Sequence, residues 1–145
     1  DFITENDLQI EEIHHPTMTE HRHQNLSVYC GDFFNLEATQ LSDCHLVFDR
    51  ASLIALPQEM RQSYAAHLQK ILPASVDMLL ITLAYHQDDM QGPPFSVEDD
   101  EVYQLFGEAF SIHKLAQFDI LKDNVKFKNR GLDRLQESIF HLHRE

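Results

Sequence analysis

The chain has 145 residues, a length that suits one domain with a packed core. Apolar residues make up 43% of it, which is typical of a globular protein and not of a disordered one. Eleven Lys and Arg residues stand against 24 Asp and Glu residues, so the formal net charge is -13. A field of this sign repels polyanions, so we expect neither nucleic acid nor an anionic membrane as a partner.

Cys30 and Cys44 are the only cysteines, and their spacing fits neither a zinc site nor a disulfide framework. Both adjoin apolar runs, so we expect them to be small core residues. The sequence has no signal-peptide pattern and no apolar run long enough to cross a membrane, which predicts a cytoplasmic protein. It opens at Asp1 in helix-like sequence, "DFITENDL", so we expect the beginning of the whole protein to be missing.

Two short apolar runs predict buried strands. Leu26–Cys30 and Cys44–Asp49 are apolar at consecutive positions rather than at alternate ones. This pattern is typical of parallel strands that are covered on both faces in an α/β protein. We therefore expect both runs in a mostly parallel sheet.

A helix and a long strand follow. Pro57 suits the first turn of the predicted helix, and Pro73 ends it. Apolar side chains recur in it at helical spacing, at Met60, Tyr64, Leu68 and Ile71. The run Val76–His86, rich in β-branched and large apolar residues, predicts a central strand. Strand, helix and strand follow one another at the spacing of a βαβ unit.

The last part of the chain predicts a loop, a helix and a hairpin. Two prolines exclude helix and central strand from Gln91–Phe95, which is therefore a loop. A helix should start with Ser96 as its N-cap and with acidic residues from Glu98 to Asp100 in its first turn. The segments "SIHKLAQFDIL" and "DRLQESIFHLH" alternate like the strands of a hairpin, with the basic "KFKNRG" between them.

Histidines are concentrated in "EEIHHPTMTEHRH", which contains His14, His15, His21 and His23. Their spacing matches no closed zinc site and no HExxH motif occurs, so we predict an exposed surface segment and no metal. Nucleophilic catalysis is not indicated either, because Ser52 lies outside a GxSxG motif and Cys30 has no basic neighbour. The four glycines form neither a P-loop nor a GxGxxG motif.

Two acidic residues follow the predicted strands. Asp32 comes just after the first and Asp49 ends the second, at the carboxyl edge where open α/β sheets bind ligands. Beside Asp49, Arg50 could be oriented toward a ligand carboxylate or an aromatic ring. Equally, Asp49 could cap the next helix while Arg50 stays exposed. The residues alone leave both interpretations open.

Four motifs in one order identify a resemblance. "YCGDFFNL", "FDRASLIALPQEMRQSYAAHL", "LLITLAYHQDDMQGPPFSV" and "FKNRGLDRLQE" resemble the bacterial members of the thiopurine S-methyltransferase family. The resemblance runs from Asp1 to near the C-terminus. It implies an α/β fold of the class I S-adenosylmethionine-dependent methyltransferases, a Rossmann-like sheet whose N-terminal strands are missing from this chain. Residues 1–145 would then be a single domain, the C-terminal part of a class I methyltransferase domain.

The resemblance also implies an activity and a cofactor. Members transfer a methyl group from S-adenosylmethionine to a thiol or thione sulfur of an aromatic heterocycle, and bacterial relatives are also associated with selenium and tellurium compounds. Asp32 and Phe33 correspond to residues that flank the cofactor adenine. Arg50 corresponds to an arginine between cofactor and acceptor. Because sulfur is a good nucleophile, holding the two reactants in line is most of the task, and no catalytic dyad is expected.

On the acceptor side, Pro94 and Phe95 match the substrate loop of the family, and Lys126 falls where some members carry a basic residue near the acceptor. The partner is then a small molecule that contains sulfur, selenium or tellurium. The family's tryptophan-containing lid, its glycine-rich cofactor loop and the strands around them have no counterpart in this sequence, which contains no Trp.

That departure leaves three hypotheses. The first is a sulfur methyltransferase, a monomer if the chain is complete. The second is a non-catalytic remnant that acts as a structural or interaction module, with self-association if the chain is truncated. The third is a metal-binding protein that uses the histidine-rich segment.

Overall fold

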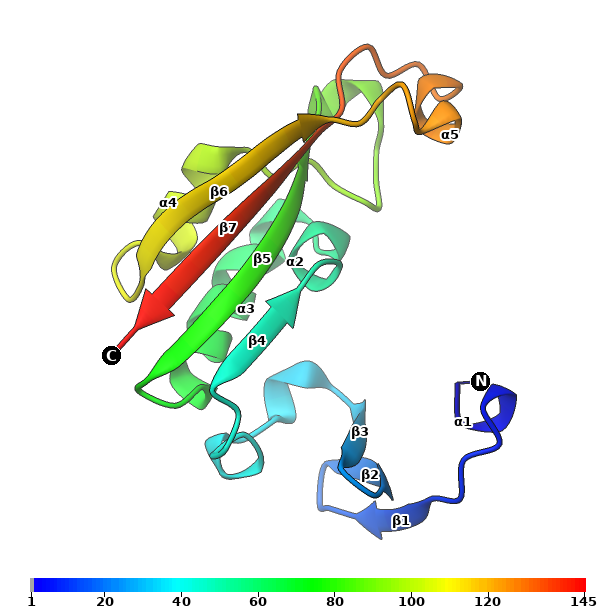
Figure 1. Cartoon of the computed structure of the whole chain (residues 1–145), viewed down its shortest axis with the longest axis vertical. Coiled ribbons are helices and arrows are strands. Elements are labelled where there is room, and N and C mark those ends of the chain that lie inside the picture. Colours follow the sequence, from blue (N-terminus) through cyan, green and yellow to red (C-terminus); the bar gives the residue numbers. More distant parts are fainter. Residues whose placement is uncertain (1) are drawn as a thin grey trace. The chain divides into compact units, whose positions relative to one another are not determined.

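The computed structural model describes residues 2–145, and the chain forms two compact units (Figure 1). The first unit extends to Glu37 and the second comprises Ala38–Glu145. Each unit has its own sheet and is described by itself. No helix among the described residues is both long enough and apolar enough to span a bilayer.

The first unit is built on a three-stranded antiparallel sheet. Its strands lie in the order β1-β2-β3, with a register that pairs Met18 with Gly31 and His23 with Leu26. A side chain at Gly31 would collide with Met18, because an added Cβ would lie 2.7 Å from the Met18 Cβ. The elements in chain order are α1 (Phe2–Glu5), β1 (Glu11–His14), β2 (Met18–His23), β3 (Leu26–Gly31) and the short 3-10 helix η1 (Phe33–Asn35).

This sheet corrects two predictions. The run Leu26–Cys30 is a strand, but it pairs antiparallel with β2 instead of joining a parallel sheet. The histidine-rich segment forms β1, β2 and the turn between them, so it is regular sheet and not only surface coil. Consecutive apolar residues do not specify the partner of a strand, which is why the sequence pattern gave the wrong pairing.

A buried carboxylate lies in the middle of this small sheet. Glu20 on β2 is 1% exposed and accepts hydrogen bonds from Ser27 Oγ at 2.7 Å and from Arg22 Nε at 3.0 Å. The ring of His15 contributes a third contact, at 3.0 Å from Nε2 to Oε2. Led by the bond from Ser27, these contacts lower the pKa of Glu20 to about 2.

The second unit contains a mixed four-stranded sheet in the order β4-β5-β7-β6. The first two strands are parallel and are joined by helices, which confirms the predicted βαβ unit. The last two strands form the predicted antiparallel hairpin, and β7 lies between β5 and β6. The strands are β4 (Leu46–Asp49), β5 (Val76–Ala84), β6 (Ser111–Asp119) and β7 (Gln136–Arg144).

Helices cover one face of this sheet. In Figure 1, α2, α3 and α4 lie behind the strands, and alternate residues of β5 and β7 point toward them and are buried, for example Met78, Leu80 and Phe140. The helices are α2 (Ser52–Ala55), α3 (Gln58–Ile71), α4 (Asp99–Phe106) and α5 (Val125–Lys128), with the 3-10 turns η2 (Ala38–Gln40) and η3 (Gln87–Asp89).

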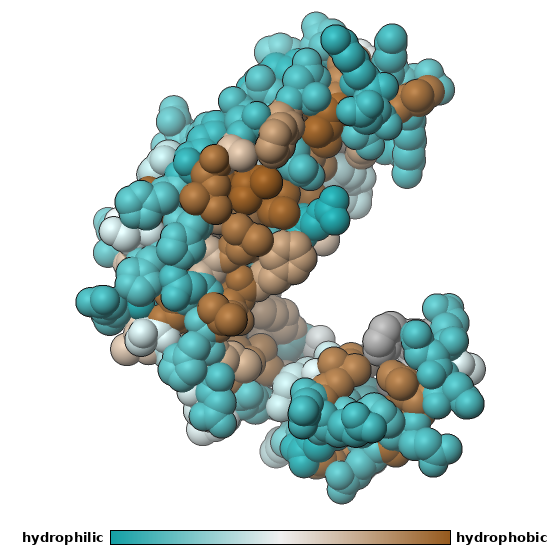
Figure 2. Space-filling view, viewed as in Figure 1, coloured by the Kyte–Doolittle hydropathy of each residue, from teal (hydrophilic) through white to brown (hydrophobic). Residues whose placement is uncertain are grey.

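The opposite face of the four-stranded sheet is open, which the sequence did not predict. Leu46 is 80% exposed and Phe48 is 65% exposed, although both were expected to be covered. Figure 2 shows apolar side chains gathered along this face of the second unit. Its exposed large apolar residues are Leu46, Phe48, Leu79 and Phe118.

Three smaller predictions are also wrong, and one helix position was not foreseen. Arg61 is buried in α3, while its neighbour Met60 is 40% exposed. The N-cap of α4 is Glu98 and not Ser96, whose hydroxyl donates to the Tyr85 carbonyl instead. Both cysteines, expected in the core, are exposed.

Candidate functional site

The carboxyl ends of β4 and β5 meet at one end of the four-stranded sheet, since Asp49 pairs in register with Leu80. Asp49 is 3% exposed, and its Oδ1 accepts the backbone N–H of Ser52 at 3.0 Å and that of Leu53 at 3.4 Å. The N-cap position of α2 is Ala51, yet these bonds satisfy the first amides of the helix. Asp49 therefore fixes the turn that carries the exposed Arg50.

The second oxygen of Asp49 is held from α3. The Tyr64 hydroxyl donates to Asp49 Oδ2 at 2.8 Å. Burial, and after it the negative charge of Asp49, raises the pKa of Tyr64 well above its ordinary value, so the hydroxyl remains a donor at neutral pH. Both Asp49 oxygens are thus occupied within the protein, and the carboxylate serves as a structural anchor beside Arg50.

A proline-rich loop lies next to this turn. We call residues 90–95 the proline loop; it contains Pro94 and Phe95, and its backbone joins α2 through a bond of 2.7 Å from Phe95 N to Ile54 O. Gly92 has φ +78, and an added Cβ there would lie 2.6 Å from Phe95 Cδ1, so the ring packs directly on the glycine backbone. The structure therefore brings the loop of Pro94 and Phe95 to the helix that follows Arg50.

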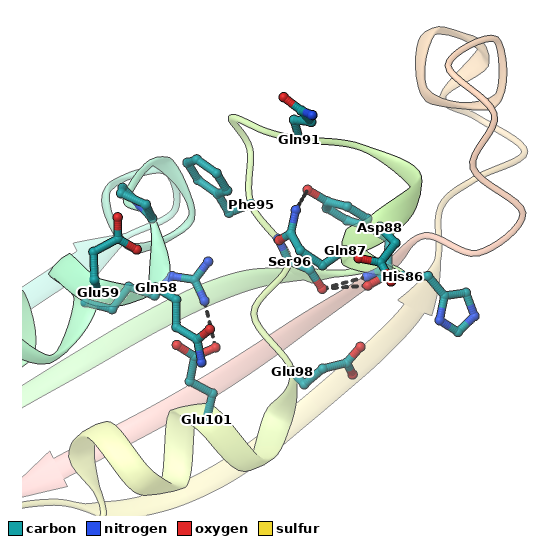
Figure 3. A pocket seen from close by; sticks show the side chains of 13 residues that line it. Gln58, Glu59, His86, Gln87, Asp88, Gln91, Phe95, Ser96, Glu98 and Glu101 are labelled. Carbon is teal, nitrogen blue, oxygen red and sulfur yellow. Dashed lines mark hydrogen bonds and ion pairs between the residues drawn. The ribbon is translucent and has the colours of Figure 1, made fainter.

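A cavity of about 670 Å³ opens beside the proline loop (Figure 3). Its size is within the usual range for small-molecule sites. Arg61 lines it and donates to Glu101 Oε2 at 2.7 Å, while its Nε donates to the Leu56 carbonyl at 2.9 Å. Among the residues expected to contact a ligand, Phe95 lines the cavity, and Arg50, Pro94 and Lys126 do not. The lining residues of Figure 3 are mostly polar, and they include Glu59, His86, Asp88, Gln91 and Glu98.

Lys126 lies on α5, in the connection between β6 and β7, and is exposed. The base of this connection packs against the proline loop. Tyr85, Met90, Leu132 and Leu135 form one buried cluster, with Phe127 of α5 against it. The structure therefore places the segments of Arg50, of Pro94 and Phe95, and of Lys126 at the same end of the four-stranded sheet (Figure 1).

Asp32 and Phe33 belong to the first unit, and their surroundings are described within it. Asp32 is the N-cap of η1 and accepts the Phe34 N–H through Oδ1 at 3.0 Å. The Phe33 and Phe34 rings meet edge to face, with centroids 5.8 Å apart. Asp32 is exposed, so an acidic oxygen and an aromatic ring follow β3 together.

No group of three or more His, Cys, Asp or Glu side chains in residues 2–145 is arranged to hold a metal ion. In the first unit, His15 is engaged with Glu20. In the second unit, His141 and His143 both contact Asp77 Oδ1, at 2.6 and 3.0 Å. These contacts lower the pKa of Asp77, that with His141 most.

Sequence reasoning missed the side chains that hold the site together. Tyr85 and Gln87 brace the proline loop, and Arg61 joins α3 to α4. Tyr85 was assigned only to a strand end, and its hydroxyl partners lie five and nine residues further along. A tyrosine a few residues before a loop with two prolines is a usable signal, because its hydroxyl can donate to carbonyls of a loop that lacks two backbone donors of its own.

Comparison with known proteins identifies the group to which the chain belongs. The family model described as thiopurine S-methyltransferase matches residues 1–145. The chain is a member of the thiopurine S-methyltransferase family. A protein of Azotobacter vinelandii named "Thiopurine S-methyltransferase" is 50% identical over 120 residues, which cover 83% of this chain and 55% of that protein. Another so named, from Pseudomonas fluorescens strain Pf-5, is 41% identical over 145 residues, 100% of this chain and 65% of that protein.

The thiopurine S-methyltransferase relatives are longer than this chain. A further one, from Marinobacter nauticus, is 49% identical over 125 residues, which cover 86% of this chain and 57% of that protein. The chain thus spans about half the length of the first curated relatives it matches. Family membership is shown, and the observed mixed α/β sheet is consistent with it.

Proposed function

We propose that the protein is an S-adenosylmethionine-dependent methyltransferase that methylates a thiol or thione sulfur on an aromatic heterocycle. Family membership and the names of the relatives support this reaction. The proposal includes a class I, Rossmann-like fold in which residues 1–145 form part of one domain. Selenium and tellurium compounds belong to the proposed acceptors and can be tested in the same assay.

One structural observation carries the proposal most directly. The bond from Phe95 N to Ile54 O joins the proline loop to the helix just after Arg50. A ligand held by Arg50 would therefore lie at the end of the sheet that also carries Pro94 and Phe95. Open α/β sheets bind their ligands at this carboxyl end.

Each site residue then has a proposed role. Asp32 and Phe33 suit an adenine, because a carboxylate oxygen can accept from its amino group while an aromatic ring packs on it. Arg50 would lie between cofactor and acceptor. Bound S-adenosylmethionine supplies an electrophilic methyl group. Pro94 and Phe95 would exclude water from the acceptor and orient its ring, and Lys126 would offer a positive charge near it.

Calorimetric titration of the chain with S-adenosylmethionine tests this function. We expect saturable binding that becomes about tenfold weaker or more in Arg50→Ala, since a charged hydrogen bond contributes about 1.5–3 kcal/mol. Lys70→Ala, which removes one exposed positive charge from α3, is the matched control and should bind like the unsubstituted chain. No binding would contradict the proposal for this chain, and equal binding by Arg50→Ala would remove Arg50 from the site.

The open face of the second unit favours a second candidate, a non-catalytic module that associates with its own copy. Leu46 and Phe48 place exposed apolar side chains on β4, which is one of the two edge strands of its sheet. Such an edge can pair with another chain. Light scattering distinguishes the candidates, because this module predicts a dimer that Phe48→Asp dissociates, whereas a monomer excludes it.

A further inference from the structure

The proline loop cannot hold its conformation with its own backbone. Pro93 and Pro94 have no N–H to donate, and Gly92 lies at φ +78, where other residues are strained. The carbonyl groups of the loop must therefore be fixed by donors that come from outside it. The structure supplies these donors from two side chains that precede the loop, Tyr85 and Gln87.

Tyr85 follows β5 directly. Its hydroxyl donates to the Pro94 carbonyl at 2.7 Å and lies 3.4 Å from the Met90 carbonyl. Gln87 donates to the same Met90 carbonyl at 2.7 Å, and its Oε1 accepts the Ser96 N–H at 2.9 Å. Two side chains thus tie the first residue of the loop to its last residues.

Tyr85 and Ser96 are also hydrogen-bonded to each other where the two arms of the loop meet, a junction that we call the neck of the loop. Ser96 Oγ donates to the Tyr85 carbonyl at 2.7 Å and accepts the Tyr85 N–H at 3.0 Å. In Figure 3 the labelled residues Gln87 and Ser96 lie close together between the two arms of the loop, and Gln87 accepts the backbone N–H of Ser96. The neck is therefore braced by a continuous set of hydrogen bonds.

The brace is anchored in the core. Tyr85 is 1% exposed and packs with Met90, Leu132 and Leu135. Burial raises the pKa of the Tyr85 hydroxyl, so it remains a donor at neutral pH. Since the ring cannot turn freely, the position of the hydroxyl fixes the Pro94 carbonyl, and with it the neighbouring Phe95.

We propose that Tyr85 and Gln87 are positioning residues for the methyl acceptor, acting through the carbonyls of Pro94 and Met90. Both residues lie within the motif "LLITLAYHQDDMQGPPFSV", but the resemblance gave neither of them a role in the site. The inference rests on the proposed function, because it assumes that the acceptor packs on Pro94 and Phe95. It predicts that removal of the Tyr85 hydroxyl loosens the loop and leaves the core intact.

Amide hydrogen exchange of the 145-residue chain tests the structural half of the proposal. In Tyr85→Phe, which keeps the ring, we expect the Phe95 amide to exchange about fivefold to tenfold faster, as for loss of one hydrogen bond of about 1 kcal/mol. Tyr103→Phe is the matched control, because it removes a hydroxyl from the exposed face of α4 and should leave Phe95 unchanged. Unchanged Phe95 exchange in Tyr85→Phe would overturn the proposal.

Steady-state kinetics tests the functional half. In Tyr85→Phe we expect KM for the acceptor, 6-mercaptopurine as the probe, to rise about fivefold to tenfold while KM for S-adenosylmethionine stays constant. Gln87→Glu is a second variant, which serves if Tyr85→Phe folds poorly. It keeps the acceptor for the Ser96 N–H but loses the donor to the Met90 carbonyl, so we expect the same rise in KM for the acceptor. If the KM values for the acceptor and for S-adenosylmethionine rose equally, or if neither rose, the positioning role would be overturned.

The two tests separate failure of the positioning role from failure of the proposed function. If the unsubstituted chain transfers no methyl group, the proposed function fails for this chain and the acceptor role of Tyr85 falls with it. Exchange at Phe95 would then still show whether the hydroxyl holds the loop. If transfer occurs but Tyr85→Phe changes neither exchange nor KM, only the positioning role is wrong.

Discussion

The hydroxyl of Tyr64, in the middle of α3, donates a 2.8 Å hydrogen bond to the carboxylate of Asp49 at the end of β4. The same carboxylate accepts two amides at the start of α2. One acidic group thus joins a strand and two helices just before Arg50. The aspartate of the Asp-Arg pair therefore has a structural role, and the arginine beside it is exposed.

Tyr64→Phe should destabilise the second unit. It leaves Asp49 Oδ2, which is buried, without this donor, and an unpaired oxygen of a buried charged group costs about 1–3 kcal/mol. Urea unfolding measures the loss. Tyr103→Phe, on the exposed side of α4, should change stability by less than about 0.5 kcal/mol, and equal losses in the two variants would contradict the role of the Asp49 bond.

Local patterns predicted most of the second unit. The helical spacing of Tyr64, Leu68 and Ile71 and the flanking prolines predicted α3, and the structure confirms it from Gln58 to Ile71. The alternation in the last segments predicted the hairpin of β6 and β7. These features depend on neighbours within one or two turns, so the sequence carries them directly.

Features that depend on distant partners were not predicted. No local pattern indicated that Arg61 is buried, where it pairs with Glu101, forty residues further along. The run at Leu26 looked like a parallel strand, and only the pairing with β2 shows that it is antiparallel. For the site, resemblance named the loop of Pro94, whereas no pattern indicated that Tyr85 and Gln87, which precede the loop, bond its carbonyls.

The pair of Arg61 and Glu101 should contribute more to stability than an exposed pair. Arg61→Leu leaves the partly buried Glu101 without its cation, and breaking a buried pair costs about 3–5 kcal/mol. Chemical denaturation gives the value. Arg134→Leu is the control, since its bidentate pair with Glu98 is partly exposed and should contribute less than about 1 kcal/mol. Similar losses would show that burial does not strengthen the pair.

Gly92→Ala should move the Phe95 ring. The new Cβ would lie 2.6 Å from Phe95 Cδ1, in addition to the strain of φ +78. Gly131→Ala separates the two effects, because Gly131 has φ +100 but no atom within 4 Å of an added Cβ. We expect about 1 kcal/mol of strain in both variants and displacement of the Phe95 NMR signals only in Gly92→Ala. Undisturbed Phe95 signals in Gly92→Ala would contradict the packing.

Acid should weaken the first unit through Glu20. The folded pKa of about 2 lies below the ordinary value of 4.5, so ionised Glu20 stabilises the folded unit above pH 4.5. This contribution declines as the pH falls from 4.5 toward 2. The measurement is an acid titration followed by the NMR signals of β2 and β3. The first unit should unfold at a higher pH in Glu20→Gln than in the unsubstituted chain. The difference in stability between the two should become smaller toward pH 2. Glu11→Gln, which changes an exposed carboxylate on β1, is the control. The pKa shift would be contradicted if the difference in stability between Glu20→Gln and the unsubstituted chain stayed constant from pH 5 to 2.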